Sequence, residues 1–169
     1  MELNEALLKR RSVRKYKDTK VKDEDIDALL HAAMAAPSAL NKKPWCFYVV
    51  SNEDLLAKIR NVNVGTQRVA PLAIVVCANL DECIEGKRGE FWIQDCSAAT
   101  ENILLKATEL GLGSLWCGIH LQDEPQAKLA KLLDLPANIV PFNVIYIGYA
   151  DEDLEARDQY DESRIHYVK

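Results

Sequence analysis

The sequence predicts an α+β domain of the α/β sandwich type, in which helices flank a central sheet. Segments with apolar residues at helical spacing alternate along the chain with short apolar runs of strand type, which is the pattern of helices packed on a sheet. The 169 residues suffice for one domain with a sizeable core, but not for two ordinary domains. Apolar residues make up 49% of the chain, so a compact fold is expected instead of disorder.

Four segments carry apolar side chains three and four residues apart, as amphipathic helices do. The second begins at Asp23, an expected N-cap, and ends before Pro37, because the residue before a proline avoids the helical conformation. Asn52 is the expected N-cap of the third helix, and Gly111 and Gly113 are expected to end the fourth. A fifth helix is expected to open at Asp123, which is followed by Pro125, and to end before Pro136. The five helices are expected over residues 2–9, 23–34, 53–61, 90–110 and 123–135.

Four short runs are rich in β-branched and aromatic residues, as strands are. Residues 72–78 (LAIVVCA) are apolar without interruption, which indicates a strand buried on both faces. The segment PSALNKKP at 37–44 is predicted to be an ordered loop. The four strands are expected over residues 46–50, 72–78, 114–118 and 143–149.

No repeat or Gly/Ser linker divides the chain before its charged end. Residues 1–150 are therefore predicted to form one domain and residues 151–169 a C-terminal arm. The arm has too few apolar side chains for a core of its own, yet Ile165, Tyr167 and Val168 are spaced as in a strand. A frayed end and an arm that adds an edge strand to another subunit both remain open.

Composition excludes several classes of function. The net charge of −5 argues against general nucleic-acid binding, which needs a basic surface. No apolar run has the length of a signal peptide or a membrane span, so a cytoplasmic protein without membrane contact is expected. The cysteines form no C-x-x-C pair and the histidines no H-x-x-H set, so neither a disulfide framework nor a metal site is expected. Cys77, Cys96 and Cys117 lie in apolar stretches and are expected to be small buried side chains.

The sequence also lacks the common catalytic motifs. It has no G-x-x-x-x-G-K-[ST], no G-x-G-x-x-G after a strand and no G-x-S-x-G. We therefore expect no catalytic side chain of its own. An enzyme with this sequence would depend on a bound cofactor for its chemistry.

A basic cluster near the N-terminus, KRRSVRKY at 9–16, gathers five cations around one serine. Arginine guanidinium groups match phosphate oxygens bidentately, and a serine hydroxyl adds a donor without bulk. In an extended segment Arg10, Ser12 and Arg14 would share one side, while Arg11 would face the other way and Val13 would pack inward. A terminal phosphate fits this arrangement. The alternative is that the cations only complement the end of the first helix.

Four stretches together resemble the FMN-dependent nitroreductase family. They are RRSVRKY, AAPSALNKKPW after the second helix, GLGSLWCGIH after the long helix, and DESRIHY at the end of the chain. The resemblance covers essentially the whole chain in the expected order. It implies a nitroreductase-like fold with a mostly antiparallel sheet, FMN as cofactor, and a homodimer in which the C-terminal arm packs on the partner subunit.

The resemblance implies an FMN site at the subunit interface. The early arginines and the serine would hold the phosphate and ribityl chain, and the loop that follows the second helix would reach the flavin ring from the partner subunit. A residue near the buried strand would contact the ribityl and pyrimidine end, and two backbone N–H groups after the third strand would lie near flavin N5 and O4. The implied cofactor-binding residues are Arg10, Arg11, Ser12, Arg14, Pro37, Ser38, Ala39, Asn41, Asn63, Gly118, Ile119 and Arg157.

Each implied role has a simpler alternative. Asn41 could be only a turn residue, Gly118 only a bulge glycine, and Arg157 could pair with Asp153 or Asp161 in the arm. Relatives commonly carry a second cation two residues after the position of Arg157, where this chain has Gln159, with Arg164 as a possible substitute. Gln67 is a weaker candidate beside Asn63, and Trp45 and Trp116 are expected to be core aromatics.

The implied activity is a two-electron transfer from NADH or NADPH through flavin N5 to a nitroaromatic, a quinone or a similar flat electrophile, with ping-pong kinetics. The alternatives are another reaction of the same fold, such as reductive dehalogenation or flavin modification, and a non-catalytic anion- or RNA-binding protein that uses the Lys9–Lys15 patch. The implied partners are a second copy of the chain and a small-molecule substrate. The helix at 90–110 is the candidate dimer core.

Overall fold

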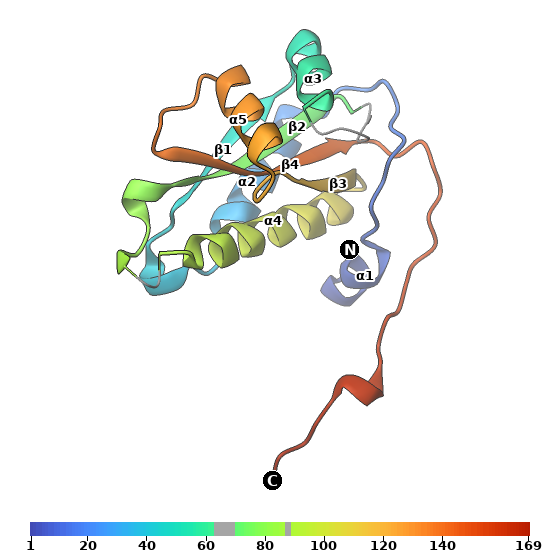
Figure 1. Cartoon of the computed structure of the whole chain (residues 1–169). Coiled ribbons are helices and arrows are strands. Elements are labelled where there is room, and N and C mark those ends of the chain that lie inside the picture. The colour runs from blue at the N-terminus through green and yellow to red at the C-terminus, as the bar shows by residue number, and fades with distance from the viewer. Residues whose placement is uncertain (63–69, 87–88) are drawn as a thin grey trace.

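A computed structural model describes residues 1–62, 70–86 and 89–169. In this part of the chain a four-stranded antiparallel sheet with strand order β1-β2-β4-β3 lies between two helical layers (Figure 1). The predicted sandwich is therefore confirmed. The strands are β1 (Trp45–Val50), β2 (Leu72–Asn79), β3 (Gly113–Gly118) and β4 (Ile139–Gly148), and the helices are α1 (Leu3–Lys9), α2 (Asp23–Met34), α3 (Glu53–Arg60), α4 (Phe91–Glu109) and α5 (Asp123–Leu132).

Strand β2 forms the middle of the fold and is buried on both faces, as predicted. Leu72, Ile74 and Val76 point into the core beneath α2 and α4, whereas Ala73 and Val75 point into the core beneath α3 and α5. All five side chains are at most 1% exposed. Helices cover both sides of the sheet, and this explains why an antiparallel strand here is apolar without interruption.

The apolar stripe of α4 packs on the sheet of its own chain. Cys96, Ala99, Ile103 and Ala107 are fully buried in the core that α4 shares with α2. This stripe therefore gives no support to the helix as a dimer core, and the dimer core at 90–110 stays a prediction. The two tryptophans predicted to be core aromatics, Trp45 and Trp116, pack against the same core.

The structure confirms two helix-end signals and corrects two others. Asn52 caps α3 by accepting a hydrogen bond from the Leu55 N–H at 2.9 Å, and Gly111 adopts φ 75° directly after α4. Asp23 is not the N-cap of α2, because the helix begins with it and its charge instead complements the helix dipole. Gly113 does not end α4 but begins β3.

Strand β4 begins earlier than predicted, at Ile139 instead of residue 143. Pro141 is an unusual residue within a paired strand, because proline cannot donate to a ladder. The structure accommodates it at a register shift between Val76 and Cys77 of β2, which pair with Asn143 and Pro141. Phe142 is the extra residue of this bulge.

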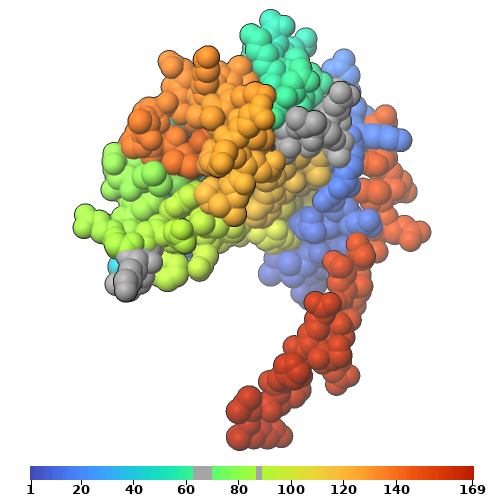
Figure 2. All heavy atoms as spheres, viewed as in Figure 1, coloured from blue at the N-terminus to red at the C-terminus, as the bar shows by residue number. Residues whose placement is uncertain are grey.

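The C-terminal arm leaves the body of the domain and forms no strand within its own chain (Figures 1 and 2). Its last residues project into solvent, with Tyr167 80% and Val168 97% exposed. The start of the arm is attached by backbone hydrogen bonds from Asp151 to Lys15 and from Arg157 to Leu8. Addition of the arm to another subunit stays a prediction.

Among the described residues, no helix is both long enough and apolar enough to cross a bilayer.

Candidate cofactor site

The segment that follows α1 is extended and lies against β3. Ser12 forms a parallel bridge with Ser114, and the Val13 N–H donates to the Ser114 carbonyl at 3.0 Å. Val13 is buried, as predicted, and its side chain occupies the space above Gly113. A Cβ at Gly113 would lie 2.7 Å from Val13 Cγ1, so only glycine permits this approach.

This anchoring places the predicted phosphate-binding side chains around one polar pocket of about 280 Å³, here called the arginine pocket. Four arginines and one serine hydroxyl face a single glutamate in its wall. The pocket therefore carries an excess of positive charge although the whole chain is acidic. It is lined by Leu7, Arg10, Arg11, Ser12, Arg14, Glu152, Leu154, Arg157 and Gln159.

Different partners hold the arginines of the N-terminal segment. Arg10 pairs with Glu101 of α4 at 3.6 Å, and Arg14 donates to the Ser12 carbonyl at 3.0 Å. Burial raises the pKa of Glu101, and Arg10 opposes this rise only in part. Arg10 and Arg14 thus line the pocket together with Ser12, as the alternation of an extended segment predicts.

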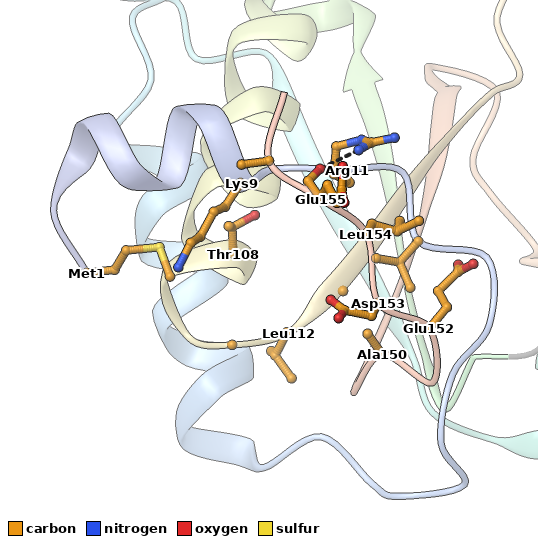
Figure 3. Close-up of a pocket in the computed structure, with 14 residues that line it drawn as sticks. Met1, Lys9, Arg11, Thr108, Leu112, Ala150, Glu152, Asp153, Leu154 and Glu155 are labelled. Carbon is orange, nitrogen blue, oxygen red and sulfur yellow. Dashed lines mark hydrogen bonds between the residues drawn. The ribbon is translucent and has the colours of Figure 1, made fainter. Parts of the chain in front are cut away.

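Arg11 was predicted to face away from these groups, and the structure places it between two pockets instead. It lines the arginine pocket and also a neighbouring pocket of about 440 Å³ between the end of α4 and the arm. Figure 3 shows Arg11 donating a hydrogen bond to the Glu155 carbonyl of the arm. Arg11 therefore fastens the arm beside the N-terminal segment.

Glu152, the first carboxylate of the arm at this pocket, orders the backbone of the N-terminal segment. It accepts hydrogen bonds from the N–H groups of Arg14 and Lys15. These bonds, with the Arg14 N–H first, lower the pKa of Glu152 below its ordinary value of 4.5.

We predict that Glu152→Gln lowers the stability of the fold at neutral pH. Because the pKa of Glu152 is lower in the folded state, its contribution is complete above pH 4.5 and is lost as the pH falls through the folded-state pKa. Thermal midpoints of the two proteins should therefore converge in acid. Glu155→Gln is the control, since Glu155 contributes its backbone carbonyl. A gap that persists unchanged in acid would contradict this role.

The arm also brings Arg157 to the arginine pocket, as the resemblance implied. The structure records no ion pair between Arg157 and Asp153 or Asp161; Asp161 pairs with Arg164 at 3.0 Å. Arg164 does not line the pocket and so does not replace the missing second cation. Gln159 lies at the pocket in that cation's place.

The loop that follows α2 is held by a buried acid of α4. The Ala39 N–H donates to Asp95 Oδ1 at 2.8 Å, and Asp95 is only 6% exposed. The loop and α4 line a second, open pocket of about 340 Å³, here called the loop pocket. It is lined by Pro37, Ser38, Ala39, Phe91, Gln94, Asp95 and Ala98.

The backbone of this loop is strained beyond the loop pocket. Leu40, Asn41 and Lys43 have φ values of 52°, 55° and 54°, a conformation that costs most residues about 1 kcal/mol or more. Asparagine tolerates it best, so the turn reading of Asn41 has structural support. Leu40 combines this strained backbone with a side chain that is 69% exposed.

We predict that Asp95→Ala destabilises the protein by about 1–3 kcal/mol, because the partly buried Ala39 N–H loses its acceptor. Asp95→Asn keeps an oxygen at this position and should cost less. Urea unfolding of the three proteins measures the difference. Equal stability of Asp95→Ala and the unchanged chain would show that the loop does not depend on this bond.

The two pockets share no residues, and both are connected to α4. Gln94 and Ala98 line the loop pocket, and Glu101, one helical turn further, pairs with Arg10. Seven residues separate Gln94 from Glu101, a rise of about 10 Å. Within one described chain no loop residue lines the arginine pocket.

The remaining predicted positions fall into two groups: Gly118 and Ile119 at the end of β3, and Asn63 and Gln67 ahead of β2 in the sequence. The Ile119 N–H already donates to the Phe142 carbonyl at 3.1 Å, and the His120 N–H donates to the same oxygen at 2.9 Å. A flavin acceptor would have to share the Ile119 hydrogen. Gly118 is exposed at the end of β3, and a Cβ there would meet nothing within 4 Å. Asn63 and Gln67 lie outside the described residues.

Sequence reasoning missed three acidic residues that support these pockets. Glu101 pairs with Arg10, Glu152 holds the backbone of Arg14, and Asp95 holds the loop. Only Asp95 left a signal: it is a charged residue directly beside the apolar stripe of α4, where burial requires a partner. The other two act across long sequence separations.

Comparison with known proteins agrees with this arrangement. The sequence profile of the Nitroreductase family matches residues 7–73 and 63–149. A protein of Methanothermobacter thermautotrophicus with the provisional name NADH dehydrogenase/NAD(P)H nitroreductase is 44% identical over 171 residues, covering 100% of this chain and 88% of that protein. An iodotyrosine deiodinase of Thermotoga neapolitana is 43% identical over 171 residues, covering 85% of this chain and 86% of that protein.

The fold gives the same result. A solved FMN-dependent nitroreductase of Clostridium difficile superposes with a TM-score of 0.87 at 34% identity, over 97% of this chain and 98% of that one. The antiparallel sandwich is thus the nitroreductase-like fold that the four sequence stretches implied. The profile match spans most of the chain, and the chain belongs to the nitroreductase family.

Proposed function

We propose that this protein is an FMN-dependent oxidoreductase that takes electrons from NADH or NADPH and reduces a nitroaromatic, a quinone or a similar flat electrophile. The arginine pocket is the observation that carries the proposal. It gathers four guanidinium groups and a serine hydroxyl around one small polar space.

The donor set of this pocket fits a phosphate monoester. Guanidinium groups only donate hydrogen bonds, and a serine hydroxyl can donate one as well, so together they match the oxygens of a phosphate dianion. The ribityl end of FMN carries such a group. The flavin ring needs a flatter and more apolar surface, which the loop pocket provides with Pro37, Ala39 and Phe91.

When bound, FMN would accept a hydride from the nicotinamide and deliver two electrons to the acceptor. The chain's own residues bind and orient. Arg10, Arg14 and Arg157 would fix the phosphate, and Asp95 fixes the loop through Ala39. The Phe142 carbonyl fixes the backbone of the turn after β3, because it accepts hydrogen bonds from the N–H groups of Ile119 and His120.

A second copy of the chain would complete the site. The arginine pocket and the loop pocket share no residues. If one FMN contacts both the arginines and the loop, the loop would therefore come from the partner subunit. The exposed Leu40 at the tip of the loop and the exposed Tyr167 and Val168 of the arm are apolar surfaces that a homodimer would bury. A monomer that retains FMN would contradict this part of the proposal.

Steady-state kinetics tests the reaction. With NADPH or NADH and a quinone such as menadione, FMN-loaded protein should give parallel double-reciprocal lines, because donor and acceptor would use one site in turn. Intersecting lines would show that both substrates bind together. If no acceptor supports FMN-dependent oxidation of NADH or NADPH, the proposed function is wrong.

Reductive dehalogenation is the second candidate, favoured by the 43% identity to an iodotyrosine deiodinase. Release of iodide from 3-iodotyrosine by the reduced protein would distinguish it from nitro or quinone reduction. The anion- or RNA-binding alternative has less support, since the cations of the Lys9–Lys15 patch share their surroundings with Glu101 and Glu152. It predicts a colourless protein whose RNA affinity falls steeply with salt.

A further inference from the structure

Two cysteines face each other across the first two strands of the sheet. Strand β1 is an edge strand beside β2 (Figure 1). The two strands pair in antiparallel register, with Cys46 directly opposite Cys77. Both side chains pack into the core beneath α3 and α5, so they lie on the same face of the sheet. All five cysteines of the chain are free thiols in this structure.

The spacing of this pair suits a covalent bond. Directly opposed residues of antiparallel strands have Cα atoms about 4.5–5.5 Å apart, within the range of about 4.4–6.8 Å that a disulfide spans. The electrostatic influence of the two thiols on each other, which lowers the pKa of Cys46 and raises the pKa of Cys77, agrees with this proximity. The neighbouring thiols are engaged elsewhere: Cys96 donates to the Cys77 carbonyl at 3.7 Å, and Cys83 donates to the Asn79 carbonyl at 3.4 Å.

We propose that Cys46 and Cys77 form a reversible oxidation site that closes to an intrachain disulfide with a hydroperoxide such as hydrogen peroxide. The sulfur of Cys46 displaces water from the peroxide O–O bond and becomes a sulfenic acid. The sulfur of Cys77 then attacks the Cys46 sulfur and releases a second water. Two thiols and one peroxide thus give one disulfide and two waters, and a dithiol reverses the change.

The two cysteines differ in a way that assigns these roles. Cys46 lies on the edge strand and is partly exposed, whereas Cys77 is fully buried in the central strand β2. The neighbouring Cys77 thiol lowers the pKa of Cys46, whereas the Cys46 thiol and burial raise the pKa of Cys77. Cys46 is therefore the thiol that a peroxide reaches first, and Cys77 is the one that resolves it.

The bond would fasten an edge strand that follows the strained loop. Strand β1 begins four residues after Asn41 and pairs only with β2 within the described sheet. A Cys46–Cys77 disulfide would therefore fix the loop's downstream anchor to the middle of the sheet. This inference does not depend on the proposed function, because it uses neither FMN nor a substrate.

Peptide mapping of the full-length protein tests the proposal. Trypsin leaves Cys77 and Cys83 in one peptide, residues 69–87, so the mapping uses a Cys83→Ser background to remove that ambiguity. After hydrogen peroxide and alkylation of the remaining thiols, we expect peptide 69–87 linked to peptide 43–58. The linked pair should lose the mass of two hydrogens and separate after treatment with dithiothreitol.

Two variants make the result decisive. Cys46→Ser, at the partly exposed position, should abolish the link and leave Cys77 open to alkylation after denaturation. Cys77→Ala should leave Cys46 as a sulfenic acid that dimedone traps. Separate peptides in the oxidised Cys83→Ser protein, or a link between two chains through Cys46, would overturn the proposal.

Discussion

Replacing Arg10 and Arg14 together by alanine should weaken the binding of FMN by at least about a hundredfold, since each charge-assisted hydrogen bond to a phosphate contributes about 1.5–3 kcal/mol. Both side chains line the arginine pocket. The fold should survive, because Arg14 is exposed and Arg10 is only partly buried beside Glu101. Fluorescence quenching of FMN by the purified protein measures the affinity.

The matched control is Lys15→Ala with Lys17→Ala. This variant removes two positive charges from the same segment, but neither lysine lines the arginine pocket. Its FMN affinity should change only through long-range electrostatics, which salt screens. An equal loss of affinity in both double variants would mean that net charge, and not the pocket, attracts the cofactor.

Gly113→Ala should destabilise the protein by about 1–3 kcal/mol, the usual cost of forcing an extra methyl group into a filled space. The new Cβ would lie within 2.8 Å of three atoms of Val13. Val13 stands between Ser12 and Arg14, so its displacement should also misplace the pocket's donors and weaken FMN binding. Urea unfolding and the FMN titration measure the two effects.

Two comparisons isolate the clash. Gly118→Ala at the other end of β3 introduces a Cβ with nothing within 4 Å and should leave the stability of the apo-protein nearly unchanged. Adding Val13→Ala to Gly113→Ala removes two of the three contacting atoms and should recover part of the loss. If Gly113→Ala and Gly118→Ala are equally stable, Gly113 does not determine the position of the N-terminal segment.

Local patterns in the sequence predicted most of the fold. Among the described residues, helical spacing located four helices and the Asp123–Pro125 signal located the fifth. The branched run at 72–78 identified the strand buried on both faces. The errors occurred where tertiary structure overrides local preference. Pro141 lies within β4 at a bulge. Helix α2 begins at Asp23 itself, so Lys22 and not Asp23 is the N-cap residue.

The candidate site was predictable only where its residues are close in sequence. Alternation in an extended segment placed Arg10, Ser12 and Arg14 together, and the family pattern added Arg157. The same alternation misplaced Arg11, because the carbonyl of Glu155, which is 144 residues away, holds its guanidinium group. Contacts of this kind depend on the path of the arm, which no local pattern encodes.

The most direct measurement of the central claim compares FMN with riboflavin, which lacks only the phosphate. Titration of the apo-protein with both ligands should show FMN bound at least about a hundredfold more tightly, and the Arg10→Ala, Arg14→Ala variant should lose most of that preference. Equal affinity for FMN and riboflavin, or no binding of either, would contradict the assignment of the arginine pocket to a flavin phosphate.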